Sequence, residues 1–78
     1  MARVPDRHRI AQDIRERIAS GEYAPGAKLP PLRELIVRYG VSAEPVRSAL
    51  LILQVEGLLE GHQGKGVFVV GHGRVARR

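Results

Sequence analysis

The sequence contains no cysteine and no tryptophan, and its only aromatic side chains are Tyr23, Tyr39 and Phe68. Without cysteine, the chain can form neither a disulfide nor a thiolate zinc site, and it has no cysteine nucleophile. So few aromatics do not make a stacking platform for single-stranded nucleic acid. No apolar run reaches the roughly 18–20 residues of a membrane span, and no signal-peptide pattern opens the chain. We therefore expect a soluble, cytoplasmic protein with no membrane partner.

With 78 residues, the chain is long enough for one small domain. A domain of this size buries only about 60–65% of the surface of its unfolded chain, which leaves little room for an active-site cleft. No Ser/His/Asp arrangement is evident. His8, His62 and His72 lie too far apart, without a carboxylate at useful spacing, to predict a metal site. The sequence thus predicts neither an enzyme nor a bound cofactor.

The charge distribution favours a polyanionic partner. Thirteen basic residues against eight acidic ones give a net charge of +5. The excess lies at the two ends, in residues 1–9 and 64–78, whereas residues 10–63 are nearly neutral. Basic ends either add affinity for nucleic acid or are simply solvated.

Apolar residues recur at helical spacing in three segments, which predicts helices over residues 8–20, 31–40 and 42–56. Gly21, Gly40 and Gly57 suit the ends of these helices, and Ser42 suits the N-cap of the third. The predicted buried stripes consist of Ile10, Ala11, Ile14, Ile18 and Ala19, then Leu32, Leu35, Ile36 and Tyr39, and finally Val46, Ala49, Leu50 and Leu53.

A glycine-rich hairpin is predicted after the third helix. Apolar residues 58–59 and 67–70 flank a tip at residues 61–66, and a very short extended piece is expected at residues 28–29. The fold class is therefore mainly α with a small β-hairpin. Because only a few residues around Gly40 join the second and third helices, the order indicates a winged helix-turn-helix. We expect this domain over residues 8–70, with a basic arm at 1–7 and a basic flexible tail at 71–78.

Six motifs, in one register over about residues 8–70, resemble the GntR-type winged helix-turn-helix. They are Ile18-x-x-Gly21-x-Tyr23-x-Pro25-Gly26-x-x-Leu29-Pro30, Arg33-Glu34-Leu35, Tyr39-Gly40-Val41-Ser42, Val46-Arg47-x-Ala49-Leu50-x-x-Leu53, Glu56-Gly57-Leu58-Leu59 and Gly64-x-Gly66-x-Phe68-Val69. The resemblance implies a transcriptional regulator that binds operator DNA as a dimer. Family members normally carry a larger effector-binding domain after this one. No small-molecule effector site fits in these residues, so the chain is either a short regulator or the DNA-binding part of a longer one.

The resemblance also implies specific DNA contacts. Arg33 matches an arginine that contacts DNA, and Ser42 matches a hydroxyl that touches a phosphate. Arg47 matches an arginine on the exposed face of the recognition helix, where its fork suits guanine or phosphate. The remaining matches belong to the wing tip that enters the minor groove: Gln63, Gly64 and Lys65.

Two departures from the family pattern bear on affinity. Pro31-Leu32 stands where members usually have Ser-Glu, and Ala43-Glu44-Pro45 stands where Arg-Thr-Thr is usual. Losing arginine at position 43 removes a base or phosphate contact. Glu44 either accepts a hydrogen bond from cytosine N4 or interacts favourably with the positive end of its own helix dipole. We therefore expect weaker DNA binding or an unusual operator.

Leu51, Ile52 and Val55 lie off the buried stripe of the third helix. As an exposed apolar face they would form an interface, either between two copies or with another protein. Alternatively, a slightly shifted core or the N-terminal arm would bury these three side chains within the monomer.

The function predicted from these patterns is sequence-specific binding of duplex DNA by a transcriptional regulator, here a repressor. A recognition helix at about 43–56 would enter the major groove, and a wing at 61–66 would touch the minor groove or backbone. A homodimer on an inverted-repeat operator is expected. The alternative is a protein-interaction module that uses Leu51, Ile52 and Val55 and binds DNA weakly or without specificity.

Overall fold

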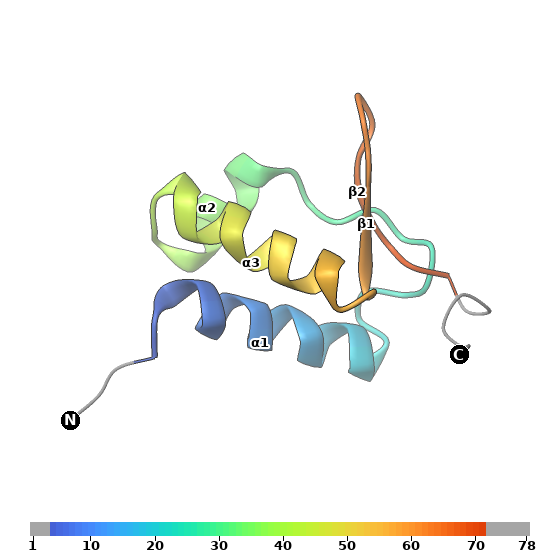
Figure 1. Cartoon of the computed structure of the whole chain (residues 1–78), viewed down its shortest axis with the longest axis horizontal. Coiled ribbons are helices and arrows are strands. Elements are labelled where there is room, and N and C mark those ends of the chain that lie inside the picture. The colour runs from blue at the N-terminus through green and yellow to red at the C-terminus, as the bar shows by residue number, and fades with distance from the viewer. Residues whose placement is uncertain (1–3, 72–78) are drawn as a thin grey trace.

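The computed structural model describes residues 4–71 as three helices followed by an antiparallel hairpin (Figure 1). In chain order the elements are α1 (Asp6–Ser20), α2 (Leu32–Tyr39), α3 (Ala43–Val55), β1 (Leu59–His62) and β2 (Gly66–Val69). This confirms the predicted fold class. Four of the cations in the predicted basic ends lie outside the described residues: Arg3, Arg74, Arg77 and Arg78. The other three, Arg7, Arg9 and Lys65, lie within them. Within residues 4–71, no helix is long and apolar enough to cross a membrane.

The first helix begins earlier than predicted. It starts at Asp6 instead of residue 8, directly after Pro5, whose φ of −57° suits entry into a helix. The Asp6 carboxylate lies in the first turn, where it interacts favourably with the positive end of the helix dipole. Arg7 therefore belongs to α1, although we expected it in the N-terminal arm.

The hairpin tip is shorter than predicted. Gly61 pairs with Val67, and His62 pairs with Gly66, so the tip contains residues 63–65 instead of 61–66. A glycine keeps the N–H and C=O groups that form the ladder, and this allows the strands to extend into the glycine-rich segment.

The segment before α2 adds to the hairpin as a third, very short extended piece. Leu29 N donates to Val67 O at 2.8 Å, and Val69 N donates to Ala27 O at 2.8 Å. Lys28 forms the bridge to Phe68 between these bonds. This confirms the predicted extended piece and attaches the hairpin to the start of the helix-turn-helix.

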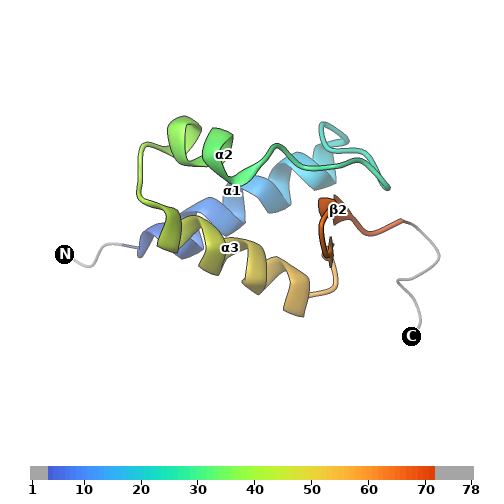
Figure 2. The same cartoon turned by 90° about the horizontal axis from the view of Figure 1, so that it is seen from above.

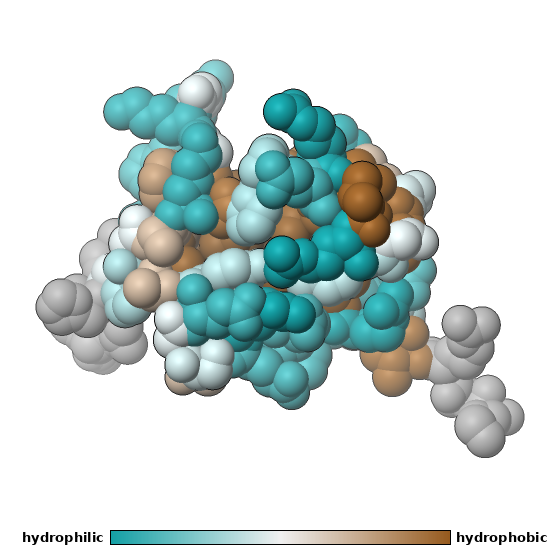
Figure 3. All heavy atoms as spheres, turned by 180° about the vertical axis from the view of Figure 1, so that it is seen from behind, coloured by the Kyte–Doolittle hydropathy of each residue, from teal (hydrophilic) through white to brown (hydrophobic). Residues whose placement is uncertain are grey.

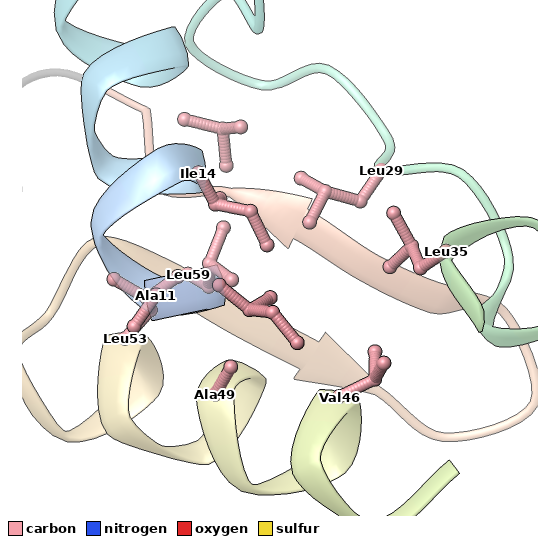
Figure 4. Packing of buried hydrophobic residues seen from close by; sticks show 10 residues of the cluster. Ala11, Ile14, Leu29, Leu35, Val46, Ala49, Leu53 and Leu59 are labelled. Carbon is pink, nitrogen blue, oxygen red and sulfur yellow. The ribbon is translucent and has the colours of Figure 1, made fainter. Parts of the chain in front are cut away.

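One apolar core joins all of these elements (Figure 4). Its buried members are Ile10, Ala11, Ile14, Leu29, Leu35, Val46, Ala49, Leu53, Leu59 and Val69. Of the predicted stripe residues, Ala19 is exposed near the end of α1. Five others are only partly buried and pack against the edge of this core: Ile18, Leu32, Ile36, Tyr39 and Leu50. Leu50 faces a groove between α2 and the hairpin, and this groove leaves one side of the residue open.

The α2–α3 turn consists of Gly40, Val41 and Ser42. Gly40 adopts the left-handed conformation with φ +66°, and its N–H donates to Ile36 O at 2.9 Å, which ends α2. Ser42 occupies the predicted N-cap position of α3, but its hydroxyl forms no capping hydrogen bond. The exposed Ser42 hydroxyl is therefore not used by the capping contact that the sequence predicts.

Polar contacts attach α1 to the helix-turn-helix. The Asp13 carboxylate accepts hydrogen bonds from Arg17 Nε at 2.8 Å and from the Tyr39 hydroxyl at 2.7 Å. At the C-terminal end of α3, Arg15 Nη2 of α1 lies 2.7 Å from the Glu56 carboxylate. Both contacts orient α2 and α3 on the first helix.

The hydrogen bonds that the Asp13 carboxylate accepts predict that the stability of the fold falls in acid. The pKa of the Asp13 carboxyl is lowered, and the largest cause is the hydrogen bond from Arg17. Burial of the carboxyl raises this pKa, and the hydrogen bond from the Tyr39 hydroxyl lowers it further. Below the ordinary carboxyl pKa of about 3.9, the unfolded chain binds a proton that the folded chain still excludes. This contribution to stability is therefore present above about pH 4 and is lost as the pH falls through the lowered pKa.

We expect Asp13→Asn to reduce the loss of melting temperature between about pH 5 and pH 2, measured by circular dichroism. The matched control is Glu16→Gln, because Glu16 is an exposed carboxylate on α1 whose hydrogen-bond donor is the neutral Gln12. Equal acid dependence in native chain and Asp13→Asn would show that this carboxylate does not cause it.

Candidate nucleic-acid interface

The helix α3 presents one face to the core and another to solvent. Val46, Ala49 and Leu53 are fully buried. The residues on the opposite face are exposed and follow a spacing of three and four: Glu44, Arg47, Leu51 and Val55. Arg47 and Leu51 therefore lie one turn apart on the same exposed side.

Cations on different elements differ in whether they are paired. On α1, Arg9 lies 3.2 Å from Asp6, and Arg17 lies 2.8 Å from Asp13. By contrast, the exposed cations Arg33, Arg47, Lys28 and Lys65 have no ion pair or side-chain hydrogen bond with any part of residues 4–71. These unpaired cations belong to α2, α3, the hairpin and the extended piece beside it, and they are available to an anionic ligand. On α1, Arg7 is likewise exposed without an ion pair or side-chain hydrogen bond within residues 4–71.

The hairpin and the helices surround a groove. In Figure 1 the tip of the hairpin rises past α3 on the side away from α1, and Figure 2 shows the hairpin nearly end-on beyond the C-terminal part of α3. The groove has a volume of about 300 Å³ and is lined by Lys28, Leu29, Pro30, Pro31, Leu32, Leu50, Lys65, Gly66 and Val67. Figure 3 shows a notch with an apolar floor between two hydrophilic projections.

The predicted wing residues lie together at the tip. Gln63, Gly64 and Lys65 are all exposed, and Lys65 N donates to His62 O at 2.9 Å to close the turn. Gly64 adopts φ +79°, which glycine accommodates without strain. Next to the tip, the His62 ring of β1 packs edge-on against Phe68 of β2 with 5.0 Å between centroids, so side chains of the two strands contact each other there.

Lys28 is a candidate that the sequence reasoning missed. Gly66 adopts φ +126°, and a Cβ at this position would lie 2.8 Å from Lys28 Cε. The glycine thus lets the lysine side chain cross the hairpin near Lys65, on the same groove. The extended piece predicted at residues 28–29 was the available signal, because a strand beside the wing brings its side chains to the wing.

The sequence matches the family described as "Bacterial regulatory proteins, gntR family" over residues 7–69. The chain belongs to this family. The Uxu operon regulator of Haemophilus influenzae is 45% identical over 62 residues, which are 80% of this chain and 23% of that protein. The mannosyl-D-glycerate transport/metabolism system repressor MngR of Escherichia coli K12 is 44% identical over 69 residues, 88% of this chain and 29% of the repressor. The chain thus spans about a quarter of these curated relatives.

Solved structures show the same fold. The AraR DNA-binding domain in complex with operator ORR3 has a TM-score of 0.85 at 33% identity, covering 88% of this chain and 83% of that one. YtrA from Sulfolobus acidocaldarius, a GntR-family transcription factor, has a TM-score of 0.82 at 37% identity, covering 91% and 74%. Both the predicted resemblance and the predicted winged helix-turn-helix are confirmed. The relatives are transcriptional regulators, which does not favour the alternative of a protein-interaction module.

In this GntR-type domain, Glu44 is exposed in the first turn of α3. Its carboxylate accepts a long hydrogen bond of 3.4 Å from the Ser48 hydroxyl, one turn along the helix. The position is favourable beside the positive helix end. A contact with cytosine stays a prediction.

The apolar face of the GntR-type domain is smaller than the sequence suggested. Leu51 is 59% exposed and Val55 is 81% exposed, but Ile52 packs against the core. Ile52 lies more than a quarter-turn around α3 from the centre of the exposed face, which turns its side chain toward the body of the domain. Two aliphatic side chains cover far less than the roughly 1,000 Å² that a stable protein interface buries.

Proposed function

We propose that this GntR-type domain binds duplex DNA sequence-specifically and regulates transcription, as a repressor. The observation that carries the proposal is the set of cations on α2, α3, the hairpin and its extended piece that have no partner within residues 4–71. On α1, by contrast, Arg9, Arg15 and Arg17 are paired within the domain. The names of the relatives and the operator complexes of AraR support it.

Each predicted residue takes a role that fits its position. Arg47 would donate two hydrogen bonds to a guanine in the major groove, which α3 enters. Arg33 and the Ser42 hydroxyl would bind phosphates, and the N-terminus of α3 favours an anion beside Ser42. Wing residues 61–66 would lie on the minor groove or backbone, where Lys65 and Lys28 add phosphate contacts.

We propose that two copies occupy the half-sites of an inverted repeat. Because the exposed apolar side chains of residues 4–71 are few, the pairing of these domains would form on the DNA. The DNA-binding unit would span about residues 8–70, and the basic residues of 1–7 and 71–78 would add salt-dependent affinity. Such a regulator acts at the chromosome, which implies the cytoplasm.

The test is selection of duplexes from a random pool by the purified chain, followed by binding in a salt series. We expect an inverted repeat to be enriched. We also expect log K to fall linearly with log salt concentration, with a slope of about −0.9 per phosphate contacted. Lys28→Gln should make that slope shallower by about 0.9 per copy without changing the selected sequence. Weak binding without sequence preference would contradict the proposal and would favour a protein partner on Leu51 and Val55.

A further inference from the structure

We infer that Leu51 reads thymine: its exposed side chain packs against the C5-methyl group of a thymine in the same groove that Arg47 enters. This rests on the proposed function. The domain then recognises a thymine near the base or phosphate that Arg47 binds, and Leu51 determines part of its sequence specificity.

The geometry of α3 places Leu51 on the proposed DNA surface. It follows Arg47 by four residues on the exposed face, so the two side chains project in similar directions. Four residues advance about 6 Å along a helix, which corresponds to one or two base pairs at about 3.4 Å each. A side chain that follows Arg47 into the groove therefore meets a neighbouring base pair.

The chemistry of this side chain selects one base. Leu51 has no hydrogen-bond donor or acceptor, and it is 59% exposed in the free domain. In the major groove the thymine methyl is the apolar group that distinguishes one base from the others. Burying leucine against that methyl removes apolar surface of both partners from water, whereas the polar edge of another base would lose hydration without a partner.

The surroundings of Leu51 favour DNA over a protein. Its neighbours on this face include the charged Glu44 and Arg47, and Arg47 has no ion pair within the described residues. A protein partner would have to cover Arg47 and neutralise it, whereas DNA supplies an acceptor for it and a methyl group for Leu51 together. Val55 lies a turn further on, beside the negative end of α3, which repels phosphates.

The experiment replaces thymine by deoxyuridine, which lacks only the C5-methyl group, at each position of the duplex selected by the native chain. Affinity is measured by fluorescence anisotropy for the native chain, for Leu51→Ala, and for the matched control Val55→Ala. We expect deoxyuridine at one thymine per half-site to weaken native binding about threefold to fivefold, which is the size of one buried methyl group. Leu51→Ala should bind the thymine duplex more weakly and should no longer distinguish thymine from deoxyuridine there. Val55→Ala should keep the native discrimination.

The outcomes separate this inference from the proposed function. If the native chain enriches no sequence, the proposed function is wrong and the inference falls with it. If a site is enriched but it tolerates deoxyuridine everywhere, or contains no thymine, only the inference is overturned. The same holds if Leu51→Ala retains the discrimination, or if it changes self-association alone, which would assign Leu51 to a protein interface. Unchanged melting temperatures of both variants would show that they are folded.

Discussion

Arg47→Ala is expected to weaken binding to the selected duplex by about 1–3 kcal/mol, or roughly fivefold to 150-fold. Arg47 is exposed on α3 without an ion pair in residues 4–71, so its guanidinium is available for bidentate hydrogen bonds to guanine. The measurement is the dissociation constant on selected and on random duplexes at one salt concentration. A loss confined to the selected duplex would identify a base contact, and an equal loss on both would identify a phosphate contact.

The control for Arg47 removes the same charge from another helix. Arg9 is exposed on α1 and pairs with Asp6 at 3.2 Å, so Arg9→Ala changes the net charge equally without touching the proposed interface. We expect this variant to lose little affinity, and mainly at low salt. If both substitutions weaken binding to the same extent, overall charge and not a local contact explains the effect of Arg47.

Leu53→Ala is expected to reduce the free energy of unfolding by about 2–5 kcal/mol. Leu53 is fully buried on the core side of α3, in the cluster that joins this helix to Ala11, Leu59 and their neighbours. The total stability of a domain of this size is on the order of 5–10 kcal/mol, so the substitution removes a large share of it. Urea denaturation followed by circular dichroism measures the change.

Leu51→Ala is the matched control for Leu53→Ala, because it makes the same chemical change two residues away on the exposed face. We expect it to alter the free energy of unfolding by less than about 0.5 kcal/mol. Comparable losses in the two variants would show that Leu51 is buried, and would contradict both its exposure and its proposed contact with thymine.

Much of the fold follows from local patterns in the sequence. The periodicity of Ile10, Ile14 and Leu53 and the glycine at position 40 predicted the helices and their sharp turn, and the structure places them as expected. Helical spacing depends on a backbone geometry that repeats every 3.6 residues, so it can be seen in a short window. The first residue of α1 and the length of the hairpin tip were less accurate, because single prolines and glycines permit several local conformations.

Two features of the candidate site required the tertiary structure. Arg15 meets Glu56 across 41 residues of sequence, so only the packed helices show that this arginine is paired, whereas Arg47 has no partner within residues 4–71. Lys28 reaches the wing because its segment pairs with β2.

Burial of the apolar side chains on α3 also depends on the tertiary structure. Leu51 and Ile52 are adjacent and chemically alike, yet one is exposed and the other packs against the core. The sequence by itself determined the helices, the family and the residues that could bind DNA. Which of these residues are unpaired, exposed and on one surface was decided by the tertiary structure, because pairing and burial depend on elements that are distant in the chain and adjacent only after folding.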